Sequence, residues 1–401
     1  MSTPLSDRDL LAKLVAFDST SSNSNLPIAN FVCDYVERCT RGRGLQIHRN
    51  PNPEGTKANV VLRLPGHCDD RGSFGRSSGN PSGRGLILSG HLDTVPANEP
   101  DWESDPFTLR EASDAFVGRG ACDMKGFVAL AVNALVRSAD RRLDDPLVLL
   151  LTFDEEPGIL GAKYFVETWK GELDLPRSVI VGEPTQLRVV RMHKGHLKLR
   201  VIVTGRSAHS GYPHLGVNAI EPFGRILTAL ADLRREFETQ RVPSSGFYPE
   251  TPFPSLSVTQ IHGGVASNII PDRCELVLGI RVLPGMAEEP LAEAVRRAVA
   301  RGAGSAACEI EVVNDSPALF TADDAPVYRA VCDLVGQKET HAVSYATDGG
   351  PLQQLALQCV IWGPGNIEVA HKPNEWIGKD EFLRGGELLE RLVRTWCVAD
   401  V

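Results

Sequence analysis

The feature that most constrains this chain is the segment from Leu86 to Pro96, LILSGHLDTVP, in which an apolar run leads directly to His91 and Asp93. The apolar residues predict a buried strand, and Gly90 ends it just before the polar residues begin. Side chains two apart on an extended segment point to the same side, so Asp93 can accept the second ring N–H of His91 and fix which nitrogen faces outward. A metal-binding histidine needs such a partner, although this pair alone fits a hydrogen-bonded histidine at a strand end equally well.

Two further apolar segments run directly into acidic side chains. The strand predicted over 146–153 is followed by Glu155 and Glu156, and the strand predicted over 178–182 is followed by Glu183. In open sheets of parallel strands, ligands bind outside the carboxyl ends of the strands. Carboxylates that converge on such an edge repel one another unless cations neutralise them. The sequence therefore predicts a cation site at this edge.

The candidate residues for the site combine two imidazoles with four carboxylates: His91, Asp123, Glu155, Glu156, Glu183 and His371. Asp123 precedes an apolar helix predicted over 127–136, so a helix N-cap is the alternative explanation of its position. The donor set suits two divalent ions, Zn²⁺ first and Co²⁺ or Mn²⁺ as alternatives. Such a pair activates water and holds a carbonyl oxygen, which is what amide hydrolysis requires. Because Glu155 and Glu156 are adjacent, one can bind metal while the other accepts the proton of the water.

The order of predicted elements indicates an α/β protein with an insertion. Strands and helices alternate over residues 1–191 and resume over 317–401, which predicts a catalytic domain with a mixed, mostly parallel sheet. Residues 192–316 follow the order β-α-β-β-α-β of a ferredoxin-like α+β domain. The length of 401 residues agrees with two domains, because single cores stop growing at about 250 to 300 residues. The antiparallel sheet of the insertion has edges available for pairing with a second copy.

Charge and composition exclude several classes of partner. The formal net charge of −9 makes nucleic acid a poor candidate. No apolar run approaches the roughly 20 residues that a membrane span needs, and the N-terminal residues do not follow the pattern of a signal peptide. Nine cysteines, without any CxxC, favour free thiols in a reducing compartment. We therefore expect a cytoplasmic protein without a nucleic-acid or membrane partner.

Residues 66–85, GHCDDRGSFGRSSGNPSGRG, are rich in glycine, serine and arginine. This composition predicts a surface loop without regular structure. A solvated insertion is the favoured interpretation, because surface loops tolerate added length. A flap on the substrate side is the alternative, because the loop immediately precedes the strand that carries the first histidine.

Seven segments, in order along the chain, resemble the M20 family of dinuclear zinc amidohydrolases: SGHLDTVP, GRGACDMKG, DEEPG, VGEPT, GRSAHSGYPHLGVNAI, GGVASNIIPD and GPGNIEVAHKPNEWI. The resemblance covers nearly the whole chain except 66–85. Within the family it is greatest, in CDMKG and in GPG followed by AHKP, for members that deacetylate N-acetyl-ornithine in arginine biosynthesis. It implies a zinc-exopeptidase-like catalytic domain, an inserted ferredoxin-like dimerisation or lid domain, and a homodimer.

The resemblance assigns metal ligands residue by residue. It implies that one ion is bound by His91, Asp123 and Glu183. It implies that the other ion is bound by Asp123, Glu156 and His371, so that Asp123 bridges the two.

The resemblance also implies catalytic and substrate-binding roles. Glu155 would be the general base, and Asp93 would orient the first histidine ligand. In the insertion, His209 would reach the site of the neighbouring subunit and stabilise the oxyanion, while Asn268 and Arg281 would contact the substrate carboxylate. Taken alone, the last three residues fit a loop histidine, a turn residue and a surface arginine.

One motif departs from the family pattern. The segment that resembles GTEAG is ATDGG here, residues 346–350, so Asp348 provides a shorter acidic side chain at a position that can face the substrate. The alternatives to N-acetyl-ornithine deacetylation are a succinyl-diaminopimelate desuccinylase, an aminoacylase or a carboxypeptidase of the same family. A dimeric binding homologue without catalysis is a further alternative, against which the retention of Glu155 and all five metal ligands argues.

Overall fold

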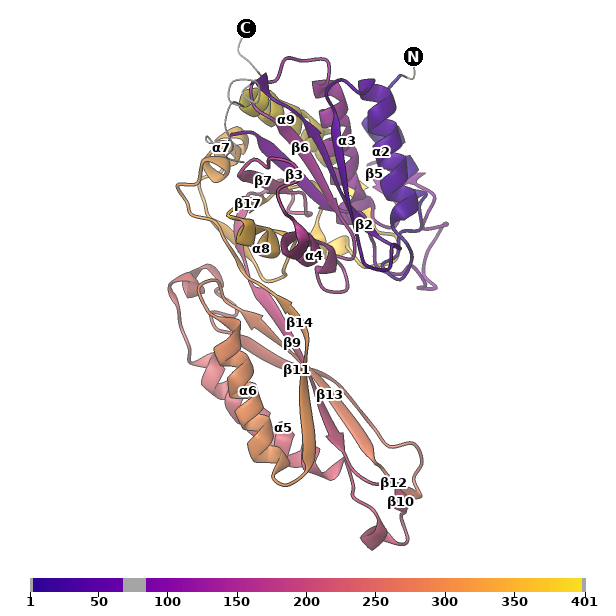
Figure 1. Ribbon diagram of the computed structural model, residues 1–401, viewed down its shortest axis with the longest axis vertical. Helices are drawn as coiled ribbons and strands as arrows, with labels where there is room; N and C mark the ends of the chain where they lie inside the picture. Colours follow the sequence, from indigo (N-terminus) through magenta and orange to yellow (C-terminus); the bar gives the residue numbers. More distant parts are fainter. Residues whose placement is uncertain (1–2, 68–83, 399–401) are drawn as a thin grey trace. The chain divides into compact units, whose positions relative to one another are not determined.

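The computed structural model describes residues 3–67 and 84–398. They form two compact units (Figure 1). Unit 1 consists of Met1–Arg191, Thr321–His341 and Thr347–Val401, and unit 2 consists of Met192–Phe320 and Ala342–Ala346. Most of the loop predicted over 66–85 lies outside the described residues. Among the helices that are described, none has both the length and the apolar character that crossing a bilayer requires.

The larger sheet is mixed, with parallel strands at its centre. Its strands, in spatial order, are β1 (Gln46–Pro51), β2 (Ala58–Leu64), β6 (Leu147–Thr152), β3 (Leu86–His91), β7 (Ser178–Val181), β17 (Gln358–Ile361), β8 (Val190–His193) and β15 (Leu319–Phe320), and β16 (His341–Val343) pairs with β8. The neighbours β6, β3, β7 and β17 run parallel, whereas β1, β2, β8 and β15 pair antiparallel. The predicted α/β class with a parallel central sheet is confirmed.

The central strands are buried along their whole length. In β3 (LILSGH) and β6 (LVLLLT) every residue is buried, as expected of parallel strands that are covered on both faces. Alternate residues of these strands share one hydrophobic core with α1 (Asp7–Val15), α2 (Leu26–Thr40), α3 (Gly126–Ser138), α7 (Pro326–Val335) and α9 (Lys379–Cys397) (Figure 1). Truncation of one such core residue, Leu149→Ala, would cost about 2–5 kcal/mol of stability.

Shorter helical elements complete unit 1. They are the irregular turn η2 (Ala121–Lys125), in which Asp123 and Met124 have non-helical backbone angles, α4 (Leu160–Thr168), α8 (Gly349–Leu352), and the 3₁₀ turns η5 (Gln353–Leu355) and η6 (Ile367–Val369). The helix α4 packs against β2 and α8. The turn η2 leads directly into α3, so Asp123 lies in the turn just before the first residue of that helix.

A small antiparallel sheet joins two distant segments of unit 1. Its strands are β18 (Trp376–Gly378), β5 (Ala115–Val117) and β4 (Arg110–Glu111). Trp376 pairs with Val117, and the N–H of Gly118 donates to the carbonyl of Glu375. The segment after β5 therefore lies against the segment before β18, which brings residue 371 near residue 123.

Unit 2 has the ferredoxin-like element order predicted from the sequence. Its main elements are β9 (Gly195–Thr204), α5 (Glu221–Glu238), β11 (Ser255–Gly263), β13 (Arg273–Val282), α6 (Glu288–Ala303) and β14 (Ala307–Ser316), with the short elements β10 (Ala208–His209), η3 (Pro213–Leu215), η4 (Pro243–Phe247) and β12 (Ile269–Ile270). The strands are ordered β11-β13-β9-β14, and all three pairings are antiparallel. Buried residues alternate along β13, and those of β9 and β13 form a separate core with α5 and α6.

Candidate metal centre

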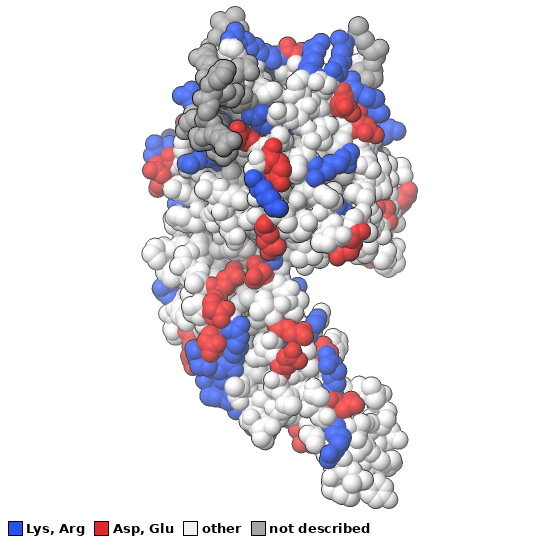
Figure 2. Space-filling view, viewed as in Figure 1, with Lys and Arg blue, Asp and Glu red and all other residues white. Residues whose placement is uncertain are grey.

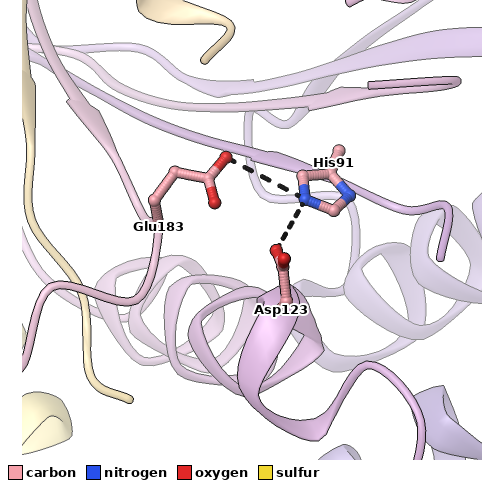
Figure 3. Close-up of side chains that lie close together, drawn as sticks. All are labelled: His91, Asp123 and Glu183. Atoms are coloured by element: carbon pink, nitrogen blue, oxygen red, sulfur yellow. Dashed lines mark hydrogen bonds and ion pairs between the residues drawn. The ribbon is translucent and has the colours of Figure 1, made fainter. Parts of the chain in front are cut away.

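His91 is the last residue of β3, and its ring is almost fully buried. Its Nε2 lies 3.1 Å from Oδ1 of Asp123 and 3.9 Å from Oε1 of Glu183 (Figure 3). Its Nδ1 lies 3.0 Å from the backbone carbonyl oxygen of Asp93 and 3.5 Å from Oδ1 of the same residue. The nearer acceptor is thus the carbonyl rather than the expected carboxylate. Both acceptors are on the Nδ1 side, so Nε2 faces the acidic cluster.

The carboxylate of Asp93 fixes the turn that follows β6. Its Oδ1 accepts the N–H of Glu155 at 3.0 Å, and its Oδ2 accepts the N–H of Glu156 at 3.2 Å and the hydroxyl of Ser21 at 2.7 Å. Burial opposes ionisation of Asp93, but His91 and these hydrogen bonds lower its pKa. A buried, charged acceptor of this kind holds the backbone of both glutamates in place.

Asp123 lies between the two histidines. Its Oδ1 is 3.1 Å from Nε2 of His91, and its Oδ2 is 3.2 Å from Nε2 of His371. Oε2 of Glu156 is 2.9 Å from the same nitrogen of His371. Two groups therefore share Asp123, one with His91 and Glu183 and the other with Glu156 and His371. Within each group the possible ligand atoms all lie within 4.8 Å of one another.

The protein without metal concentrates negative charge at this site. Burial and then the charge of Asp123 raise the pKa of Glu183 and of Glu156, and burial and then Glu183 raise the pKa of Glu155. Hydrogen bonds with Asp123 and Glu156 raise the pKa of His371 to about 10. The raised pKa values mean that, without a cation, the glutamates and His371 of the cluster bind protons more tightly than free side chains do. Nitrogen and carboxylate ligands in this arrangement fit divalent cations, which would supply positive charge.

A glycine allows Glu183 to reach the cluster. Glu183 follows Gly182 at the end of β7, and a Cβ atom built on Gly182 would lie 1.9 Å from Cδ1 of Phe127. Any larger residue would therefore push β7 away from α3. The close packing of these two elements places Glu183 opposite Asp123 (Figure 3).

The two ligand groups differ in their access to solvent. His91, Asp123 and Glu183 are buried, whereas the side chain of His371 is 51% exposed. His371 lines an open cavity of about 380 Å³ together with residues of the 95–99 segment. A substrate can therefore approach the cluster from the side of His371.

The candidate residues of unit 2 lie on exposed or half-buried positions. His209 in β10 is exposed, and its Nδ1 accepts the N–H of Gly211 at 3.0 Å. Asn268 is also exposed and is brought beside the β10 turn, since its carbonyl accepts the N–H of Ser210 at 2.9 Å. Arg281 in β13 is half-buried. Within the described part of the chain, no carboxylate lies within ion-pair distance of the Arg281 guanidinium.

Three buried charged residues lie near the cluster but are not among the predicted site residues: Asp348, which the sequence analysis noted only as a shortened acid that can face the substrate, and the pair Arg119 and Glu375. Asp348 accepts the hydroxyl of Thr152 at 2.6 Å, and burial raises the pKa of Asp348 to about 6. Arg119 and Glu375 form a buried ion pair at 2.9 Å. The sequence held a weak signal for this pair, because Arg119 precedes Asp123 by four residues and Glu375 follows His371 by four.

Comparisons with known proteins identify the family and agree with the fold. Residues 87–395 match the model of peptidase family M20/M25/M40. The chain is 34% identical over 398 residues to an acetylornithine deacetylase of Proteus mirabilis, covering 98% of this chain and 96% of that protein. Among solved structures, an M20 family metallo-carboxypeptidase from Sulfolobus solfataricus has a TM-score of 0.77 at 17% identity, covering 98% of this chain and 99% of that one. A dinuclear metal-binding M20 peptidase from Bacillus subtilis has a TM-score of 0.63 at 15% identity, covering 97% and 98%.

Proposed function

The chain belongs to peptidase family M20/M25/M40 and is a metal-dependent amidohydrolase, and from this premise we propose that it deacetylates N-acetyl-ornithine. The products are acetate and ornithine, which places the reaction in arginine biosynthesis. The relatives that carry the name acetylornithine deacetylase, at 34% and 38% identity over almost the full chain, support this substrate. The observation that carries the chemistry is the pair of ligand groups that share Asp123.

The two ligand groups are assigned one metal ion each. His91, Asp123 and Glu183 would hold one ion, and Asp123, Glu156 and His371 would hold the other. Zn²⁺ is the ion proposed for both sites, because imidazole and carboxylate ligands suit it, with Co²⁺ or Mn²⁺ as alternatives. When bound, the two ions would polarise the amide carbonyl and lower the pKa of a water molecule.

Glu155 is the proposed general base. Its backbone is fixed by Asp93, and its neighbour Glu156 is the residue that contacts His371. Burial among other carboxylates raises the pKa of Glu155, which suits a group that must accept a proton and release it again. In this mechanism Glu155 takes a proton from the attacking water and delivers it to the nitrogen of the departing amine.

The proposed substrate contacts come from unit 2. His209 would donate a hydrogen bond to the oxyanion in the site of the neighbouring subunit, and Asn268 and Arg281 would bind the substrate carboxylate. Arg281 is suited to this role because its planar guanidinium can bind both oxygens and has no acidic partner among the described residues. A second cation lies near it, since burial and then the charge of Arg281 lower the pKa of Lys194 to about 8.

We further infer that the chain forms a homodimer through unit 2, which then serves as dimerisation or lid domain. On the face shown in Figure 2, the end of unit 2 that carries β10 and β12 shows few charged side chains. Exposed apolar side chains gather there: Tyr212, Leu215, Val217, Val265 and Ile269. Such a surface favours contact with protein. A mass of one chain in light scattering would contradict the dimer. The cytoplasm remains the location predicted from the sequence.

A substrate panel tests the proposed activity. The purified protein, loaded separately with Zn²⁺, Co²⁺ or Mn²⁺, is assayed for amine release from N-acetyl-ornithine, other N-acetyl amino acids, N-succinyl-diaminopimelate and dipeptides. We expect the highest kcat/KM with N-acetyl-ornithine. Turnover of another member without turnover of N-acetyl-ornithine would assign the activity to that substrate class. The shorter acid Asp348 makes this comparison necessary.

A further inference from the structure

A buried network around Arg119 reaches two of the segments that carry proposed metal ligands, those of Asp123 and His371. The Arg119 side chain is 1% exposed. Its Nη1 donates to Oε2 of Glu375 at 2.9 Å and to the carbonyl of Lys372 at 3.3 Å. Its Nη2 donates to the carbonyl of Pro96 and to Oε1 of Glu99, both at 3.0 Å. One guanidinium thus joins the loop after β3 to the segment that contains His371.

Glu375 extends this network to the backbone of the bridging ligand. Its Oε1 accepts the N–H of Cys122 at 2.9 Å and the N–H of Asp123 at 3.0 Å. Its Oε2 is the atom that pairs with Arg119. The carboxylate is almost fully buried. A single side chain therefore connects the guanidinium to the turn that presents Asp123.

The buried charged groups of this network depend on one another for hydrogen bonds. A buried charge costs several kcal/mol unless it is paired and hydrogen-bonded. Here Glu375 accepts three hydrogen bonds, and Arg119 divides its donors among two carboxylates and two carbonyls. The arrangement leaves little freedom for the Asp123 backbone or for Lys372, the residue next to His371.

We propose that Glu375 and Arg119 are positioning residues for the metal centre, a role that rests on the proposed function. Glu375 sets the orientation of Asp123, whose two oxygens face different histidines. Arg119 holds Glu375 in place and also fixes the backbone beside His371. A rotation of Asp123 would displace a ligand atom from both ions at once, so the position of this backbone controls the affinity for the pair.

Two substitutions at Glu375 distinguish the effect of its hydrogen bonds on metal binding from the effect of its negative charge. In Glu375→Gln the side chain keeps nearly the same shape, but one of its two oxygens is replaced by an NH₂ group. This NH₂ group cannot accept a hydrogen bond, so the side chain can no longer accept from both Arg119 and the Cys122–Asp123 backbone. In Glu375→Asp the charge remains, but the shorter side chain cannot span the guanidinium and the backbone. Since changes to residues that hold metal ligands typically weaken metal binding about 10–100-fold, we expect losses in that range for both variants. Affinity for Zn²⁺ is measured by competition with a chelator.

The matched control is Glu99→Gln. Glu99 pairs with the same guanidinium, so the substitution removes the same charge, but Glu99 has no hydrogen bond to the Cys122–Asp123 backbone. We expect its Zn²⁺ affinity to stay within about threefold of the unsubstituted protein, below the range for positioning residues. Thermal unfolding of each metal-free variant reports any general loss of stability.

The outcomes are distinct. Unchanged Zn²⁺ affinity in both Glu375 variants overturns the proposal, as does a loss in Glu375→Gln alone, which would be an effect of charge. Equal losses in Glu99→Gln and Glu375→Gln would assign a general structural role. If the Glu375 variants do not fold, Arg119→Lys takes their place, and failure of all three to fold overturns positioning in favour of folding. Fewer than two ions bound by the unsubstituted protein would refute the proposed metal centre itself.

Discussion

Unit 1 and unit 2 present their candidate residues in contrasting ways. In unit 1 the acidic and imidazole side chains follow buried strands and contact one another directly, as in the contact of His91 with Asp123 at 3.1 Å. In unit 2, His209 and Asn268 lie exposed at the short antiparallel pairing of β10 with β12. The difference indicates that unit 1 builds its cluster before any ligand arrives. The unit 2 residues instead acquire their proposed partners only when substrate or a second chain is bound.

The contrast follows from the strands themselves. The parallel strands of unit 1 are covered on both faces, so only their ends are free to present polar side chains. In β13 of unit 2 buried residues alternate with partly exposed ones, and Arg281 is one of the partly exposed residues of the strand. Rigid strand ends suit metal ligands, whereas a partly exposed sheet suits a substrate carboxylate.

The largest effect that tests this contrast is expected for Glu155→Gln. Loss of a general base typically lowers the rate about 10²–10⁴-fold. Because Glu155 is not one of the proposed ligands, the number of metal ions bound should be unchanged. Steady-state kinetics and metal analysis of the same sample measure both. A near-normal rate would show that Glu155 is not the base, and loss of metal would make it a ligand.

A smaller loss is expected for His209→Asn in unit 2. Removal of one donor to a developing oxyanion costs about 10²–10³-fold in kcat. Since the ring of His209 is exposed, metal content and the unfolding temperature should both stay unchanged. Kinetics, metal analysis and thermal unfolding are compared with those of Ser207→Ala, an exposed residue of the same segment. A change in metal affinity would contradict this difference between the units, because it would mean that His209 contributes to the metal centre of unit 1.

The smallest effect is expected for Asp348→Asn, and it concerns stability. Burial raises the pKa of Asp348 from 3.8 to about 6, so the folded metal-free chain binds this proton more tightly than the unfolded chain does. Stability therefore falls as pH rises from about 4 to about 6 and stays lower above that range. Asparagine removes this penalty, which predicts a gain of about 1 kcal/mol near pH 8 and less near pH 4.5. Urea unfolding of the metal-free protein measures both values, and equal gains at the two pH values would contradict the assignment.

The sequence predicted the elements whose patterns are local. The apolar runs of β3, β6 and β7 and the alternating segments of unit 2 appear where they were expected. The helix α4 and the small sheet of β4, β5 and β18 were not predicted. Their segments are short, and two- or three-residue strands carry too little periodicity to recognise.

Within the site, the sequence could group His91, Asp123 and Glu183 because each stands next to a buried element. It could not predict that the carbonyl of Asp93 lies closer to His91 than the carboxylate does. Nor could it connect Arg119 with Glu375, since 256 positions separate them and β18 must pair with β5 before they meet. The contacts that hold the ligands depend on tertiary structure, which a single sequence does not reveal.

The pairing of β8 with β15 has an evolutionary consequence. Met192 and Phe320, the first and last residues of the long segment of unit 2, are partners in one antiparallel ladder. A domain whose first and last residues are adjacent can be exchanged or altered by recombination without disrupting the domain into which it is inserted. The strands of unit 1 that lead to the proposed metal ligands can thus be inherited unchanged while unit 2 varies.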